Sequence, residues 1–255
     1  MSDATPTIDT GHRRLLRLLA PTILLVVLVF AMPLMAPLFH AAFPALERPV
    51  YTRASFLALT LSHIGIVLTA SIPVIIAGIA AGIFVTRESG REFAGVLGMI
   101  TAIGQTFPPS AVLAIAVPLV GYGGEPTIVA LIAYGILPVV DNTIAGLRSV
   151  SSAAVGAADG LGFRPLQRLV RVELPLAAPV ILAGVRTSVI ISIGNAAIGS
   201  TVGALTLGSP IIEGLSGSNT AYVIQGALLV GLLAIATDQM FAWLDERLRR
   251  RIGVG

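Results

Sequence analysis

Long apolar runs constrain the fold of this chain more than any other feature of its sequence. An α-helix needs about 20 predominantly apolar residues to cross the roughly 30 Å hydrocarbon core of a bilayer. The runs that reach or approach this length cover residues 15–39, 55–85, 93–119, 127–147, 174–201 and 221–243. Only 11% of residues are charged, against about 25% in soluble domains. The sequence therefore predicts an all-α polytopic membrane protein with about six transmembrane helices.

The first two runs differ from simple upright spans. The run 15–39 exceeds the roughly 7–15 apolar residues of a secretory signal peptide, so we expect an uncleaved first span. The run 55–85 is too long for one upright helix and contains Pro73. Proline removes a backbone donor and crowds the preceding turn. We therefore expect this span to be tilted, and broken or kinked at Pro73.

The distribution of arginine predicts the orientation in the membrane. If the N-terminus is cytoplasmic, the inner connections carry thirteen of the sixteen arginines, the outer connections carry Arg48 and Arg53, and Arg186 lies inside a span. Basic residues in short loops remain on the cytoplasmic side of a membrane. Both termini are therefore expected in the cytoplasm, which requires an even number of spans.

Two residue types are missing from the chain, and their absence excludes several functions. Without cysteine there are no disulfides, thiolate metal sites or cysteine nucleophiles. Without lysine there is no P-loop lysine, so ordinary ATP binding on this chain is excluded. The three histidines are scattered, and neither HExxH nor GxSxG occurs. We expect no catalytic residue, no metal and no cofactor. Because the arginines flank apolar runs, membrane lipids rather than nucleic acid are the expected partner of the positive charge.

The longest polar stretch, 148–175, lies on the expected cytoplasmic side. Ser151 or Ser152 can cap a short helix by accepting a bond from a free backbone N–H. Gly160 and Gly162 are expected to end that helix. Pro165 then suits the first turn of a second short helix over 166–172.

These two short helices predict a compact knob on the cytoplasmic surface. Its exposed face is expected to carry Leu161, Phe163 and Leu166, with a rim formed by Arg164 and Arg168. An apolar centre with a polar, basic rim is typical of a protein docking surface.

The spacing of the same stretch resembles the cytoplasmic coupling loop of type I ABC importer permeases. That family's motif is Glu-Ala-Ala, three residues, Gly, nine residues and Ile-x-Leu-Pro. Here Ala157-Ala158, Gly162 and Val172-Glu173-Leu174-Pro175 stand at those intervals, with Gly156 in place of the glutamate. Any ion pair of that glutamate with an ATPase must be absent or supplied by Asp159. The resemblance implies these ATPase-coupling residues: Ala157, Ala158, Asp159, Gly160, Leu161, Gly162, Phe163, Arg164, Arg168, Leu174 and Pro175.

Further segments, 104–123, 134–147 and 173–194, look like the permeases of osmoprotectant importers, which take up glycine betaine, choline and related quaternary amines. This resemblance implies a multi-pass protein of the bacterial inner membrane. Its expected parts are a cytoplasmic tail at 1–14, a transmembrane permease domain at 15–245 with the coupling loop 148–175, and a basic tail at 246–255. The implied partners are cytoplasmic ABC ATPase subunits, a second identical or homologous permease, and a periplasmic or lipid-anchored solute-binding protein.

A few polar residues interrupt the spans and are candidates for the transport pathway or its gate. Arg186 must find water or a partner, because a charge there costs at least about 2.5–3.5 kcal/mol, and Asp141 is the nearest expected partner. Asn142 and Asn195 can bond across helices. In the third run, the helix is interrupted by Gln105, Thr106, Pro108 and Pro109. Irregular backbone at membrane depth needs a protein interior or a water-filled cavity. The alternative role of Arg186 is a structural ion pair, and that of Asn142 and Asn195 is contact between helices. The alternative for the interruption in the third run is a simple kink.

Other functions remain as alternatives to an osmoprotectant permease. Importers of amino acids or other small solutes share the implied fold. An independent secondary carrier has no reason to keep a coupling loop, and it would want an ionisable group near the midplane. An intramembrane enzyme lacks a nucleophile–base or metal constellation in this sequence.

Overall fold

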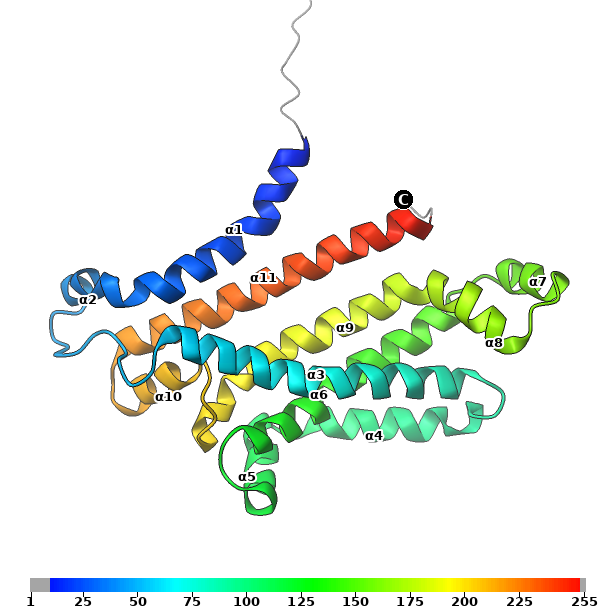
Figure 1. Cartoon of the computed structure of the whole chain (residues 1–255). Helices are drawn as coiled ribbons and strands as arrows, with labels where there is room; N and C mark the ends of the chain where they lie inside the picture. The colour runs from blue at the N-terminus through cyan, green and yellow to red at the C-terminus, as the bar shows by residue number, and fades with distance from the viewer. Residues whose placement is uncertain (1–9, 253–255) are drawn as a thin grey trace, which may run out of the picture.

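The computed structural model describes residues 10–252, which form a bundle of helices (Figure 1). The helices are α1 (Thr10–Ala31), α2 (Ala36–Ala42), α3 (Phe56–Thr86), α4 (Ala94–Thr106), α5 (Pro109–Val120), α6 (Gly124–Arg148), α7 (Ser152–Gly160), α8 (Pro165–Arg168), α9 (Leu174–Ala196), α10 (Ser209–Ser216) and α11 (Thr220–Ile252). Short 3₁₀ turns lie at Met32–Met35, Arg91–Phe93 and Ile198–Val202. The only β-contact among the described residues is an isolated bridge between Gly123 and Gly203.

The prediction of about six spans is confirmed. Five single helices are long and apolar enough to cross a membrane: Leu19–Ala42, Phe56–Thr86, Gly124–Arg148, Pro165–Ala196 and Thr220–Ile252. The sixth span is the pair formed by Arg91–Thr106 and Pro109–Val120, which is bent by 94°. Of the expected N-terminal tail, residues 1–9 lie outside the described part and residues 10–14 belong to α1. Of the expected basic tail, residues 246–252 continue α11.

The bundle has two distinct ends (Figure 1). The α3–α4 connection, α7 and α8 gather at one end, and α2, α5 and α10 lie at the other. The first end carries most of the arginines, so it is the cytoplasmic end. The C-terminal turns of α11 point to the same end.

The expectation of a break at Pro73 is wrong, because α3 runs continuously from Phe56 to Thr86. The helix packs closely on α6 through a pair of glycines one turn apart. A Cβ at Gly78 would lie 2.7 Å from Val139 Cγ1, and one at Gly82 would lie 2.6 Å from Thr143 Cβ. Such small-residue contacts let membrane helices pack closely. Neighbouring helices commonly support a proline inside a membrane helix in this way.

A fully buried histidine joins three segments, although the sequence suggested no role for it. His63 on α3 accepts a bond at Nδ1 from the Leu207 N–H at 3.3 Å, so its other nitrogen carries the proton. That Nε2–H donates to the Ile193 carbonyl on α9 at 3.0 Å. Unmade bonds inside a membrane protein are costly. His63 therefore holds the connection before α10 against α3 and α9.

Gln225 on α11 similarly holds the outer connection between α2 and α3. Its Nε2 donates to the Pro49 carbonyl at 2.6 Å, and its Oε1 accepts from the Tyr51 N–H at 3.1 Å. The Tyr51 ring also packs edge-on against Tyr222, with ring centroids 5.4 Å apart. This outer loop is therefore a fixed part of the bundle.

Candidate functional site

The cytoplasmic loop forms the turn that its glycine spacing predicts. The hydroxyl of Ser151 caps α7 by accepting from the Ala154 N–H at 3.3 Å. At the other end, Phe163 N–H donates to the Ala158 carbonyl at 3.1 Å and Gly162 N–H donates to the Asp159 carbonyl at 2.9 Å. This crossed pair of bonds is the Schellman arrangement, which requires a left-handed residue after the helix. Gly162 is that residue, with φ of +76°.

The second expected helix is not separate from the fifth span. Helix α8 passes through a π-helical turn, Leu169–Glu173, directly into α9. The wider turn lies where Pro175 lacks a backbone donor and where its ring would crowd the Arg171 carbonyl. A π-turn inside an α-helix relieves such a conflict locally. The loop is therefore rigidly continuous with a membrane span, which the sequence prediction of a helix ending at 172 missed.

Two arginines and two carboxylates clamp the loop to the bundle. Arg168 NH1 contacts both oxygens of Asp159, at 2.8 and 2.9 Å, and its Nε donates to Glu173 Oε1 at 2.9 Å. Arg87, just after α3, donates to the other oxygen, Oε2, of Glu173 at 2.6 Å. Glu173 is only 5% exposed. These four residues, the loop clamp, connect α7 and α8 to the inner ends of α3 and α9.

The exposed face of the loop differs from the predicted knob in two positions. Leu161 and Leu166 are 76% and 69% exposed, as expected, and Arg164 is exposed beside them. Phe163 is half-buried rather than exposed. Arg168 is not a free rim charge, because its guanidinium is held inside the loop clamp. The docking surface is thus formed mainly by leucines.

The other expected coupling residues fall into three environments. Ala157 and Gly160 are exposed on α7, whereas Ala158 is buried beneath it. Leu174 and Pro175 are partly buried in the first turn of α9. Of the two alternatives for the glutamate's ion pair, its absence or its replacement by Asp159, the structure shows the Asp159 carboxylate bound to Arg168.

The sequence analysis gave Glu173 and Arg87 no role of their own. Glu173 lies between Val172 and Leu174, so its charge stands in an otherwise apolar stretch. That contrast was the available signal, because a charge between apolar residues needs a partner once it is buried. Arg87 gave no comparable signal among the other cytoplasmic arginines.

The expected pairing of Arg186 with Asp141 is wrong. Arg186 on α9 instead contacts Asp238 on α11, with Nε at 2.7 Å and NH2 at 2.6 Å from Oδ1. Both partners lie within spans, where an isolated charge is costly. The pair therefore joins the fifth and sixth spans, and the choice of partner follows from the rotation of α9, which packs on both α6 and α11.

Breaking this pair should impair folding more than reversing it. Asp238→Asn leaves the Arg186 charge inside the membrane, at an expected cost of about 2.5–3.5 kcal/mol. We expect a several-fold lower yield of monodisperse protein and a lower melting temperature in detergent. The double variant Arg186→Asp/Asp238→Arg restores a pair and should recover most of both. Equal losses in the single and double variants would show that the pair does not hold the spans together.

Asp141 lies on a side of α6 that faces neither α3 nor α9. Val139 and Val140 face α3 beside Gly78, and Asn142 meets Gly184 of α9. Since successive helix residues differ by about 100°, Asp141 points away from both contacts and is exposed. No ion pair of Asp141 occurs among the described residues. The carboxylate lies seven residues, or about 10 Å, from the cytoplasmic end of α6.

The remaining candidate pathway residues have mixed environments. Asn142 donates to the Pro138 carbonyl of its own helix at 2.8 Å, so this bond does not cross helices. Asn195 is half-buried near the end of α9. Gln105 ties α4 to α6 through a 2.9 Å bond to the Tyr134 carbonyl. The expected interruption of the third span is confirmed by the 94° bend between α4 and α5, with Thr106 and Pro108 exposed there and Pro109 starting α5.

Among the side chains of residues 19–252, no group of three or more His, Cys, Asp or Glu residues is placed to hold a metal ion. The described chain thus presents an exposed apolar loop, a clamp of charged side chains beneath it, and an exposed carboxylate on a membrane helix.

Comparison with known proteins agrees with this arrangement. Residues 78–250, more than half of the chain, match the family described as binding-protein-dependent transport system inner membrane component. The osmoprotectant import permease protein OsmY of Salmonella typhimurium is 39% identical over 186 residues, covering 73% of this chain and 79% of OsmY. The choline transport system permease protein OpuBB of Bacillus subtilis is 41% identical over 189 residues, covering 74% of this chain and 86% of OpuBB.

A solved structure shares the fold at low sequence identity. A chain of the MetNI methionine ABC transporter, in an inward-facing conformation, superposes with a TM-score of 0.66 at 18% identity. The match covers 74% of this chain and 93% of that chain. With the spans, the broken third span and the cytoplasmic loop in place, this chain belongs to the family of binding-protein-dependent transport system inner membrane components, and it is a multi-pass protein of the bacterial inner membrane.

Proposed function

We propose that this chain is the permease subunit of an ATP-driven importer for glycine betaine, choline or a similar quaternary amine. Its work is alternating access, driven by an ATPase on a separate chain. The relatives named above are permeases for osmoprotectants and choline, which supports this substrate class. The loop around Gly162 is the proposed ATPase docking site.

One observation carries the ATPase assignment: two leucines are exposed on a loop that is rigidly clamped to the membrane spans. Leu161 and Leu166 lie in water in the isolated chain, and burying each would stabilise a complex by about 1.5–3 kcal/mol. The loop clamp and the continuous α8–α9 helix connect this surface to two spans, α3 and α9. A partner that moves the loop therefore also moves the spans.

Copurification tests the docking role. The chain alone should show no ATPase activity, and coexpression with its cognate ATPase should yield a stable complex. Leu161→Ala/Leu166→Ala should reduce the retained ATPase at least tenfold, because about 1.4 kcal/mol corresponds to tenfold in affinity. Leu215→Ala, which truncates an equally exposed leucine at the outer end, is the matched control. Full retention by the loop variant, or hydrolysis by the isolated chain, would contradict the proposal.

We place the transport path along the side of α6 that carries Asp141. A bare carboxylate facing lipid chains would be costly, so its exposure in one subunit supports a water-filled space or a second subunit there. One six-span chain cannot enclose a path alone, so a second permease, identical or homologous, faces this surface. The proposed lining also includes Thr106 and Pro108 at the break, Asn142, Asn195, and Gln105 beside them. A carboxylate in the path favours cationic solutes over anionic ones.

Cysteine labelling tests the water-filled path, because the chain has no native cysteine. In the assembled transporter, Asp141→Cys should react with a membrane-impermeant thiol reagent applied to inside-out vesicles. Ile76→Cys, an exposed position on α3 within its span, is the control and should not react. If Asp141→Cys is as unreactive as Ile76→Cys, this face of α6 does not line the path.

The partners of this chain follow from the same proposal. The ATPase binds at the cytoplasmic end, and a periplasmic or lipid-anchored solute-binding protein delivers the solute at the outer end. Recognition of the quaternary ammonium group by aromatic rings is assigned to that protein, since only 5% of the residues of this chain are aromatic.

A further inference from the structure

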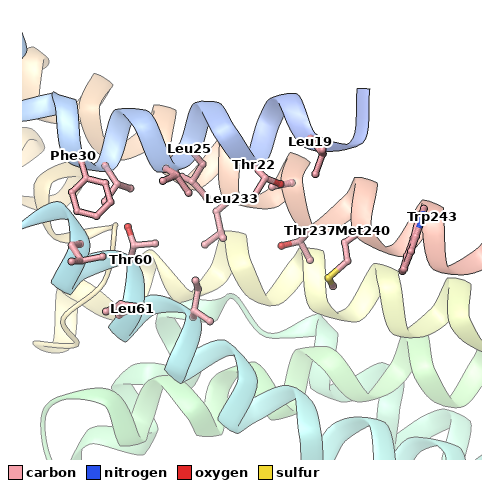
Figure 2. Close-up of a pocket in the computed structure, with 15 residues that line it drawn as sticks. Leu19, Thr22, Leu25, Phe30, Thr60, Leu61, Leu233, Thr237, Met240 and Trp243 are labelled. Carbon is pink, nitrogen blue, oxygen red and sulfur yellow. The ribbon is translucent and has the colours of Figure 1, made fainter. Parts of the chain in front are cut away.

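A deep apolar groove lies between α1, α3 and α11 (Figure 2). Its volume is about 660 Å³. Its walls are aliphatic and aromatic side chains, with threonines as the only hydroxyl-bearing residues. Leu19 and Trp243 lie at one end of the groove and Phe30 at the other. The transport path proposed above lies on α6, so this groove is a separate feature.

The position of the groove restricts its occupant. All three walls belong to membrane spans, so the groove opens toward the bilayer rather than toward water. An ionic solute would find no charged partner along these walls, and burying its charge there would be costly. An acyl chain needs no such partner, and its apolar surface matches these walls.

The face of α11 that lines the groove continues to the cytoplasmic end as a basic face. It carries Leu233, Thr237, Met240 and Trp243 inside the groove. At 100° per residue, the same face then presents Arg247 and Arg251, both exposed. The Arg247 guanidinium lies 3.9 Å from the centroid of the Trp243 ring. Tryptophan is enriched at the level of lipid headgroups, so the arginines are placed beside the headgroup of a lipid whose chain enters the groove.

The two other arginines at this end of α11 are arranged differently. Arg249 pairs with Asp245 at 2.8 Å and Arg250 pairs with Glu246 at 2.7 Å. Among the described residues, Arg247 and Arg251 form no ion pair. The two arginines without a carboxylate partner therefore lie in line with the groove. Their positive charge complements an anionic headgroup.

We propose that this groove binds an anionic phospholipid, with one acyl chain between α1, α3 and α11 and its phosphate held by Arg247 and Arg251. Basic pockets at the cytoplasmic ends of membrane helices bind anionic headgroups in this way. Helix α1 packs mainly along α11, and the groove lies between it and α3. The bound chain therefore fills the interface between α1 and the rest of the bundle.

Lipid retention measured by native mass spectrometry tests this site on the full chain. Purified protein is incubated with phosphatidylglycerol or phosphatidylcholine of identical acyl chains. Phosphatidylglycerol should be retained at least tenfold more than phosphatidylcholine, because each arginine near an anionic lipid raises the affinity about fivefold. Arg247→Ala/Arg251→Ala should abolish this preference. Arg249→Ala/Arg250→Ala removes the same number of arginines, but both are paired with carboxylates, so this variant should keep the preference within about twofold.

A second variant separates the acyl chain from the headgroup. Ala236→Phe fills the groove from α11 and should lower retention of both lipids at least tenfold, and Leu61→Trp does the same from α3 if the first variant is poorly folded. If the two arginine double variants lose the preference for phosphatidylglycerol equally, general charge attraction explains the binding and the proposal is overturned. Unchanged retention after filling the groove would show that the chain lies elsewhere. None of these outcomes depends on the ATPase or on transport, so they do not test the proposed function.

Discussion

Replacing Gly162 by aspartate should reduce retained ATPase and ATP-driven solute uptake at least tenfold at matched membrane levels. Gly162 has φ of +76°, and a Cβ there would meet no atom within 4 Å. The penalty is therefore backbone strain of roughly 1 kcal/mol or more, not a clash. The new carboxylate would also stand beside Leu161 on the docking surface, where desolvation adds a few kcal/mol.

Two controls separate strain from charge. Gly162→Asn introduces a side chain of the same size as aspartate, with a similar left-handed backbone preference but without the charge, and it should retain most of the ATPase. Gly156→Glu adds a carboxylate to the same loop at an exposed helical position with open space around it, and it restores the glutamate of the family motif. It should leave coupling intact. Normal transport by Gly162→Asp with full ATPase bound would show that this loop is not the coupling element.

Replacing Glu173 by glutamine should release the loop from the spans. Glu173 is buried and neutralises both Arg87 and Arg168. Removing one partner of a fully buried pair costs about 3–5 kcal/mol. The effect is smaller here because Arg87 and Arg168 keep 29% and 25% of their side chains exposed. We expect a lower melting temperature, faster tryptic cleavage at Arg168 or Arg171, and uncoupled or lost transport.

The matched control for Glu173→Gln is Asp159→Asn, which also removes a carboxylate from Arg168. The Asp159 side chain is 51% exposed, and exposed pairs contribute only about 0–1 kcal/mol. Its variant should therefore keep the melting temperature within a few degrees and keep the loop resistant to trypsin. If the two variants behave alike, burial of Glu173 does not stabilise the loop.

The parts of the site that sequence predicted correctly depend on local chemistry. Gly162 is needed wherever a helix ends in a left-handed residue, and the spacing to Pro165 then starts the next helix. The exposure of Leu161 and Leu166 follows from the same short turn. The broken third span follows from consecutive prolines, which cannot continue a helix.

The parts that sequence analysis missed depend on contacts between distant segments. Glu173 binds Arg87 across 86 positions, and no periodicity in the sequence connects them. His63 similarly forms hydrogen bonds with Ile193 and Leu207, which lie 130 and 144 positions further along the chain. Phe163 is half-buried, which its neighbours in the sequence do not indicate.

The sequence by itself determined that this chain is a six-span membrane protein with its arginine-rich side in the cytoplasm and one long loop there. Those properties follow from the hydrophobicity, charge and glycine content of each segment, which act locally. Only the tertiary structure decided that Arg186 binds Asp238 rather than Asp141, and that α3 continues through Pro73. These outcomes depend on the rotation and packing of helices against one another, because a helix residue finds its partner only when the neighbouring helix presents that face.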